Sequence, residues 1–437
     1  MGRLISTLIL ILVLAGLGGY IYFVDRDRPV AGTEEAKPKA FEVSPENIEE
    51  VQITNAAGEK ARVQRVDANW LLVEPEKADA DATAVASVTS SVASLEVQRV
   101  VDENPSDLTQ YGLNPPKIDV AFRVKDQKEF QRLLVGDKTP TGADLYAKKP
   151  DENRVFLISS FLDASFNKTA FDFRDKTILE FEREMADGVE ITAGPTTVQL
   201  SRMGTEWRLL KPVAVRADDA GAEGIITRLS TGQMQRVVAN EAVDLRQYGL
   251  DRPSVSATVS SGSSRATLLF GRATEGGFFA KDSARPVVFT VDEGLATELK
   301  KTVADLRRKD MFDARSFTAT RIELRRGAES FTFEKTKEGE KDVWKNAAGQ
   351  VADSAKVEDL MTKLSNLRAV SFEASTPAAL KQPALTATVR YDENKNETAM
   401  FARLGADVYG SRADEPAAAK LEASVFDEAM KALDAMK

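Results

Sequence analysis

A block of sequence that occurs three times constrains the possible folds of this chain more than any other feature. Trp207 follows Trp70 by 137 residues, Trp344 follows Trp207 at the same spacing, and the chain has no other tryptophan. Around the first two tryptophans, an aspartate (Asp81, Asp218) and a Gln-Tyr-Gly-Leu quartet recur at that spacing without a gap. Self-similarity at one fixed period indicates tandem structural repeats.

The repeat predicts a domain organisation that uses the whole chain. Units of about 130 residues lie near the common size of a folded domain. The third unit is degenerate, because the quartet is replaced there by Leu380-Lys381-Gln382-Pro383. The predicted segments are residues 1–24 (transmembrane signal-anchor), 25–43 (tether), 44–181 (repeat one), 182–314 (repeat two) and 315–437 (repeat three).

Each repeat has the pattern of an α+β unit. Residues 51–54 and 61–66 alternate between apolar and polar around a turn, which predicts a hairpin, and residues 70–73 add a third strand. Val85, Val88, Val92 and Leu95 then recur at helical spacing. Four further strands follow, and a helix closes each unit near residues 160–171, 293–306 and 424–436. This order lacks a βαβ rhythm and predicts an antiparallel sheet with packed helices in each of three tandem repeats.

Residues 4–24 form an apolar run that no charged residue interrupts. A helix of this length spans about 31 Å, which matches the hydrocarbon core of a bilayer. The alternative is a cleaved signal peptide, but its apolar region is usually shorter and no small-residue cleavage site follows directly. The short N-terminus before a large body predicts a single-pass protein of the bacterial inner membrane, with its bulk on the extracytoplasmic, periplasmic side.

Composition narrows the classes of chemistry that the chain can perform. It has no cysteine and no histidine, so disulfides, thiolate nucleophiles and the commonest general base and metal ligand are excluded. The net charge of −9 and the lack of a long basic run argue against a nucleic-acid partner. The sequence therefore predicts no catalytic residue, no cofactor, no metal site and no enzyme activity.

The residues that recur among the repeats have a structural explanation. Trp70, Trp207 and Trp344 are predicted to be core residues beneath the helix, the alternative being a ladder for ligand stacking. Asp81, Asp218 and Asp353 each precede a helical run, where an N-cap belongs, rather than forming a carboxylate set. The Gln-Tyr-Gly-Leu quartets include Tyr111-Gly112-Leu113 and Tyr248-Gly249-Leu250. Their glycines are predicted to adopt a left-handed backbone and their leucines to turn inward.

Two charged segments invite a functional interpretation. Arg174-Asp175 and Arg307-Arg308 end the closing helices of repeats one and two, where alternating charge is typical of a solvated junction. The alternative is a corner that docks a partner.

A calcium-binding loop is another candidate that the sequence does not support. Asp392, Asn394 and Asn396 have the opening spacing of a calcium loop, but Glu397 replaces the required glycine and no closing glutamate follows.

These motifs together resemble one family. The apolar N-terminus, Trp-Leu-Leu at 70–72, Gln-Tyr-Gly-Leu-x-x-Pro at 110–116 and 247–253, Leu-Leu-Val-Gly at 133–136 and Phe-Arg-Asp-Lys at 173–176 resemble the bacterial domain of unknown function 4340. The resemblance implies a membrane-anchored extracytoplasmic repeat protein. Such proteins are similar in genomic setting to accessory parts of ABC-2-type exporters and gliding-motility-type transport systems.

The predicted function is a non-catalytic accessory or scaffold subunit, with the membrane and a protein of an ABC-type transport complex as partners. Two alternatives stay open: a protein that binds an envelope polymer or lipid, and an envelope hydrolase that uses a pair of carboxylates.

Overall fold

The computed structural model describes residues 37–392 and 395–437. The chain divides into two compact units, one ending at Asp175 and the other running from Lys176 to Lys437. The predicted anchor, residues 4–24, lies outside the described residues. Within the described ranges, no helix is long and apolar enough to cross a membrane.

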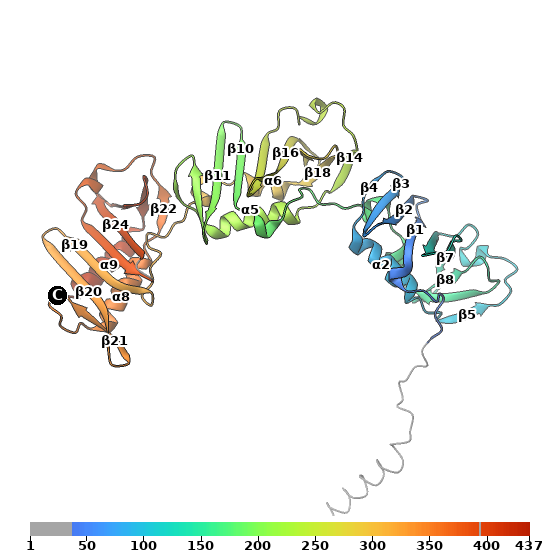
Figure 1. Ribbon diagram of the computed structural model, residues 1–437, viewed down its shortest axis with the longest axis horizontal. Helices are drawn as coiled ribbons and strands as arrows, with labels where there is room; N and C mark the ends of the chain where they lie inside the picture. The colour runs from blue at the N-terminus through green and yellow to red at the C-terminus, as the bar shows by residue number, and fades with distance from the viewer. Residues whose placement is uncertain (1–36, 393–394) are drawn as a thin grey trace, which may run out of the picture. The chain divides into compact units, whose positions relative to one another are not determined.

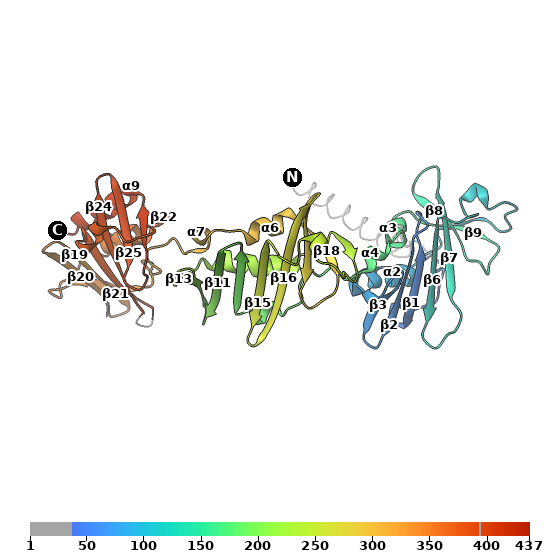
Figure 2. The ribbon, with the colours of Figure 1, turned by 90° about the horizontal axis from the view of Figure 1, so that it is seen from above.

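Repeat one is a nine-stranded antiparallel sheet with helices on one face. Its strands lie side by side in the order β4-β3-β2-β1-β6-β7-β8-β9-β5, which Figure 2 shows for β3 to β8. The elements are η2 (Pro45–Asn47), β1 (Ile48–Thr54), β2 (Lys60–Val66), β3 (Asn69–Glu74), β4 (Ala78–Asp79), α2 (Ala82–Ala93), β5 (Arg99–Asp102), η3 (Thr109–Tyr111), β6 (Ile118–Val124), β7 (Gln131–Lys138), β8 (Asp144–Lys148), β9 (Val155–Ser159), α3 (Leu162–Phe166) and α4 (Ala170–Phe173).

Repeat two has the same nine-stranded order, β13-β12-β11-β10-β15-β16-β17-β18-β14. Helix α5 follows one face of this sheet (Figure 1). The elements are η4 (Arg183–Met185), β10 (Gly188–Ala193), β11 (Thr196–Met203), β12 (Glu206–Lys211), β13 (Val215–Arg216), α5 (Asp219–Thr231), β14 (Arg236–Ala239), η5 (Arg246–Tyr248), β15 (Val255–Ser261), β16 (Ser264–Thr274), β17 (Gly277–Asp282), β18 (Val288–Asp292), α6 (Glu293–Leu299) and α7 (Val303–Leu306).

Repeat three has eight strands in the order β21-β20-β19-β23-β24-β25-β26-β22. The two-residue edge strand that β4 and β13 provide in the other repeats has no counterpart among them, and only an isolated bridge joins Lys345 to Val351. The elements are β19 (Ala319–Arg326), β20 (Glu329–Glu338), β21 (Lys341–Asn346), α8 (Ser354–Ser365), β22 (Ala369–Phe372), η6 (Ala378–Lys381), β23 (Leu385–Tyr391), β24 (Lys395–Leu404), β25 (Asp407–Arg412), β26 (Ala418–Leu421) and α9 (Ala423–Asp434).

The prediction of three α+β repeats with antiparallel sheets is therefore confirmed. In repeat one, β1 pairs with β2 through Val51 opposite Val63 and Ile53 opposite Ala61, which places the alternating apolar residues on one buried face. Val85, Val88 and Val92 of α2 are fully buried against that face. The hydrophobic surface of the helix and that of the sheet thus form the core of each repeat.

The closing helix differs from the prediction in repeats one and two, where two short helices replace one. The break lies at Thr169 and Thr302, each of which accepts a hydrogen bond from the backbone three residues on and forms a capping box with Asp172 or Asp305. Repeat three keeps a single helix, α9.

The predicted tether of residues 25–43 differs from the structure over its last residues. Ala40 and Phe41 are buried in the core of repeat one, and the N–H of Ala40 donates to the carbonyl of Leu95 at 2.8 Å. Their side chains are apolar, so burial stabilises this segment on the sheet instead of leaving it in solvent. Repeat one therefore begins before residue 44.

The same leading segment occurs in the other repeats. Isolated bridges join Lys39 to Glu96, Thr177 to Gln233 and Asp310 to Arg368. Phe41, Leu179 and Phe312 follow these bridges at equivalent places, and all three are buried. The leading segments are therefore residues 38–41, 176–179 and 309–312, and the last two lie before the predicted boundaries of their repeats.

Candidate interaction site

The predicted docking residues lie where the closing helices α4 and α7 end. Arg174 is buried in repeat one and forms an ion pair with Glu76, and Asp175 donates its N–H to the carbonyl of Asp79 at 2.9 Å. In repeat two, Arg308 donates its N–H to the carbonyl of Arg216 at 3.1 Å. Both helix ends therefore continue as a short extended segment beside the edge strand β4 or β13.

The side chains of Arg307 and Arg308 reach residues of repeat three. The guanidinium of Arg307 stacks on the ring of Phe372, with 3.6 Å between its central carbon and the ring centroid. Its Nη2 lies 3.6 Å from Oε2 of Glu415. Burial lowers the pKa of Arg307, and the nearby Glu415 carboxylate opposes that shift. Arg308 Nε lies 3.3 Å from Oδ1 of Asp313.

Arg216, which the sequence did not mark, makes the closest contacts with repeat three. Its side chain is 4% exposed. Nε donates to Oε1 of Glu415 at 2.8 Å, Nη1 to Oδ1 of Asp313 at 2.8 Å and Nη2 to the carbonyl of Asp310 at 2.7 Å. A guanidinium presents its donors in a fixed fork, so these three bonds fix the position of repeat three against β13.

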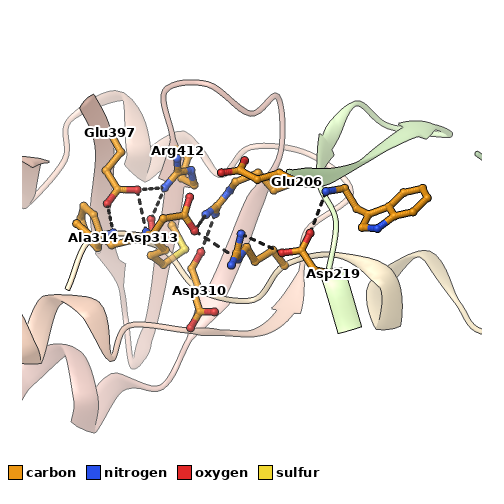
Figure 3. A network of polar contacts seen from close by, with 12 residues as sticks. Glu206, Asp219, Asp310, Asp313, Ala314, Glu397 and Arg412 are labelled. Carbon is orange, nitrogen blue, oxygen red and sulfur yellow. Dashed lines mark hydrogen bonds and ion pairs between the residues drawn. The ribbon is translucent and has the colours of Figure 1, made fainter. Parts of the chain in front are cut away.

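A second buried ion pair, between Glu397 and Arg412, holds the backbone of Asp313, one of the acceptors of Arg216 (Figure 3). Glu397 accepts hydrogen bonds from the N–H groups of Asp313 (2.9 Å) and Ala314 (2.8 Å) and from Nη1 of Arg412 (2.8 Å). Arg412 also holds Asp414 through Nε at 2.9 Å. Arg412 and Glu397 are thus paired with each other where both side chains are buried in repeat three.

The pKa shifts in this network follow from burial and charge. Burial alone would lower the pKa of Arg412, but its hydrogen bonds to Asp414 and Glu397 raise it. Burial opposes ionisation of Asp414, yet Arg412 holds the pKa of that carboxyl below its usual range. Burial and the Glu397 carboxylate raise the pKa of Tyr391 to about 12. Arg412 and Asp414 therefore stay charged, and Tyr391 stays neutral, at neutral pH.

Arg307 and Arg308 thus contact the third repeat of the same chain. We name this set the repeat two–three joint; it comprises Arg216, Arg307, Arg308, Asp310, Asp313, Phe372 and Glu415. Docking of a separate partner at Arg174 and Asp175 stays a prediction.

A cation in or next to one hairpin turn holds the leading segment in every repeat, and the sequence did not reveal this feature. Lys149 Nζ donates to the carbonyl of Ala40 at 3.2 Å, Arg285 Nη2 to that of Thr177 at 2.7 Å and Arg412 Nη1 to that of Met311 at 2.7 Å. Lys149 and Arg285 lie in the turns that join β8 to β9 and β17 to β18, and Arg412 is the last residue of β25, just before the turn to β26. A cation at each of these turns is the only signal that the sequence offers, because the acceptors are backbone atoms.

The recurring aspartates cap helices. Asp81 accepts from the N–H groups of Thr83 and Ala84, Asp218 from that of Gly221, and Asp353 from those of Ala355 and Lys356. These bonds satisfy backbone donors that the first helical turn leaves without an intrahelical acceptor. Each of the three carboxylates belongs to its own repeat and caps the helix that follows it.

The quartets form tight corners before β6 and β15. Gly112 and Gly249 have φ of 65° and 70°, in the left-handed region, and Leu113 and Leu250 are each 2% exposed. The Tyr111 ring packs on Tyr146 with 5.0 Å between centroids, and Tyr248 packs on Phe279 at 5.3 Å. The corner therefore has a packing role in both repeats.

The tryptophans are buried, with exposed fractions of 7% for Trp70, 2% for Trp207 and 1% for Trp344. One cation lies over each ring: Arg65, Arg202 and Lys335, at 5.0, 5.0 and 4.9 Å from the centroid. Each ring thus packs in the core and also contacts a cation from a neighbouring strand.

Within residues 37–392 and 395–437, no group of three or more acidic side chains is arranged to hold a metal ion.

Comparison with known proteins identifies the family to which this chain is similar. The family model described as "Domain of unknown function (DUF4340)" matches residues 70–212 and 207–387. A search of curated proteins finds no significant match. Among solved structures, a DNA polymerase sliding clamp from Pseudomonas aeruginosa has 9% identity over 88% of this chain and 93% of that chain, with a TM-score of 0.15. A putative DNA polymerase III beta subunit from Eubacterium rectale has 8% identity over 88% and 92%, with a TM-score of 0.17. Scores this low carry no argument about fold or function.

Proposed function

This chain belongs to the DUF4340 family, and on that premise we propose that it is a non-catalytic accessory subunit of an ABC-type or gliding-type envelope transport system. Residues 1–24 anchor it in the bacterial inner membrane, and the repeats lie on the extracytoplasmic side. The family resemblance and the uninterrupted apolar run of residues 4–24 support this placement.

The observation that carries the proposal is the repeat two–three joint. Its charged side chains hold a segment of the same chain. Arg216 donates to Glu415, Asp313 and the carbonyl of Asp310, and Arg307 stacks on Phe372. The helix end that forms this joint recurs in repeat one as Arg174-Asp175. A surface whose charged side chains hold a protein segment suits a scaffold better than a catalyst.

Exposed apolar side chains indicate where a protein partner would bind. Phe161 is 70% exposed, Val243 is fully exposed and Phe317 is 81% exposed, one residue in each repeat. The centre of a protein interface is enriched in aromatic side chains and depleted of charged ones. These three positions are therefore suited to report on a partner.

Site-specific photocrosslinking in intact membranes tests the proposal. A photoreactive amino acid replaces Phe161, Val243 or Phe317 in the full chain, and matched controls carry it at the exposed polar positions Asp126, Glu275 and Glu340. Mass spectrometry should recover an ABC-type permease or its partner subunits from at least one apolar position and from no control. Recovery of no membrane transport protein from any position would contradict the accessory role.

A further inference from the structure

A polar cleft in repeat one lies between the tyrosine corner, the β7–β8 hairpin and the end of α3. Its volume is about 560 Å³, within the usual range for small-molecule sites. The residues that line it with polar groups are Gln110, Lys117, Asp137, Lys138, Asp163 and Asn167. Tyr146, Leu145 and Ile118 form its apolar wall. We name this feature the repeat-one cleft.

The charges of the repeat-one cleft come as two neutral pairs. Lys117 forms an ion pair with Asp137, and Lys138 Nζ lies 3.3 Å from Oδ2 of Asp163. Each of the four side chains is between 35% and 57% exposed, so its polar atoms can reach a ligand. The cleft thus presents ammonium donors next to carboxylate acceptors, without an excess of either charge.

The aromatic wall is held in place by its neighbours. The Tyr146 ring packs on Tyr111 at 56° between planes, and the hydroxyl of Tyr111 donates to Oδ2 of Asp102 at 3.1 Å. Gly136 approaches the carbonyl of Tyr111 so closely that a Cβ there would overlap it. The corner therefore packs directly against β7 and β8.

The opposite wall is also fixed by hydrogen bonds. Asn167 at the end of α3 accepts from the N–H of Ala56 at 3.0 Å, and Glu59 accepts from the N–H of Ala170 at 2.9 Å. These bonds tie the β1–β2 turn to both closing helices. A site whose walls are already ordered loses little entropy when a ligand binds.

Repeat two shows that the fold does not require these charges. Lys117 and Ser254 directly precede the equivalent strands β6 and β15, and their N–H groups donate to the carbonyls of Val135 and Phe270. At the positions equivalent to Asp137, Lys138 and Asp163, repeat two has Arg272, Ala273 and Ala296. The same corner, hairpin and helix form there without either ion pair, so another role explains the charges of repeat one.

We propose that the repeat-one cleft binds a hydroxyl-rich saccharide. A sugar hydroxyl both donates and accepts, so it matches a carboxylate that lies beside an ammonium group. The C–H face of a pyranose ring is apolar and packs on an aromatic ring such as that of Tyr146. The neutral sum of the lining charges suits an uncharged glycan better than a highly charged ligand.

To test this proposal, the full chain is titrated with chitotetraose, and binding is measured by ligand-observed NMR and by calorimetry. The double variant Lys138→Ala, Asp163→Ala introduces the residues that repeat two has, so it should fold with an unchanged circular dichroism spectrum. Loss of hydrogen bonds to charged groups should weaken binding by at least about tenfold. Arg272→Ala at the equivalent corner of repeat two is the matched control and should bind as the wild type does.

Three outcomes would overturn the proposal. The first is no saturable binding of chitotetraose or of maltotetraose by the wild-type chain. The second is equal affinity of the double variant and the wild type. The third is tighter binding of a zwitterionic tetrapeptide than of either saccharide, which would assign the cleft to peptides instead.

Discussion

Arg216 of repeat two donates through Nε to Oε1 of Glu415 in repeat three at 2.8 Å, and the two side chains are 4% and 6% exposed. The two residues are 199 positions apart in the chain. A buried ion pair adds little net stability over an apolar pair, but removal of one partner leaves a buried charge without compensation. The Arg216–Glu415 contact therefore makes the repeat two–three joint sensitive to single substitutions.

Arg216→Ala should open this joint. The loss of one partner of a buried pair costs about 3–5 kcal/mol. Hydrogen exchange of residues 307–318 should therefore become faster by about a hundredfold or more. Arg246→Ala breaks an ion pair whose side chains are 78% and 51% exposed, and it should leave exchange unchanged. Unchanged exchange in Arg216→Ala would show that the joint does not depend on this guanidinium.

Glu397→Gln should destabilise repeat three. Both carboxylate oxygens accept from backbone N–H groups and one also accepts from Arg412, so an amide NH₂ in either position would face a donor. The expected cost is about 3–5 kcal/mol, measured by thermal unfolding followed at Trp344. The control is Asp414→Asn, which changes the other carboxylate partner of Arg412. The Asp414 side chain is 49% exposed, so this change should cost much less stability than Glu397→Gln. Equal costs would contradict the special role of the buried carboxylate.

Gly136→Ala should destabilise repeat one, because the added methyl overlaps the carbonyl of Tyr111. A backbone clash of this kind costs about 3 kcal/mol. Gly224→Ala is the matched control: it lies inside α5, where a Cβ meets only the end of the Glu298 side chain at 3.5 Å. That change should stabilise the helix by about 0.5–1 kcal/mol. Denaturant unfolding of both variants decides the sign of each effect.

Acid should weaken repeat one through Glu50. Burial opposes ionisation of this carboxyl, but hydrogen bonds from Arg123, Gln52 and Arg62 lower its pKa below 4.5. Because the folded-state pKa is lower than the unfolded value, the stabilisation is complete above pH 4.5 and is lost as the pH falls through the folded pKa. Glu50→Gln should flatten the stability profile below pH 4.5, whereas the exposed Glu103→Gln should not. An identical acid slope in Glu50→Gln would rule out this carboxyl as the cause.

Local features of the fold could be predicted from the sequence, because their causes lie within a few residues. Asp81, Asp218 and Asp353 cap the helices that follow them, and Gly112 and Gly249 adopt the left-handed backbone of their corners. The two capping boxes at Thr169 and Thr302 were equally local. Their Thr-x-x-Asp spacing was a readable signal that the closing helix is divided in repeats one and two.

Features that depend on distant partners could not be predicted. The edge strands β5, β14 and β22 have four residues each, too few for a clear alternation, and each pairs with a strand that follows much later in its repeat. Arg216 stands in the two-residue strand β13, and nothing near it in the sequence indicates a partner at Glu415. The sequence pattern favoured a solvated junction at Arg307, but this side chain is buried and its partner Glu415 is another part of the same chain.

The cations that hold the three leading segments bind backbone carbonyls, and this choice of acceptor affects how such a chain can grow. Every residue has a carbonyl, so the contact places no demand on the identity of Ala40, Thr177 or Met311. The segments differ accordingly, and each needs only an apolar residue at the position of Phe41, Leu179 or Phe312. Each cation belongs to the same repeat as the leading segment that it holds, so a duplicated repeat would bring both partners of this contact with it.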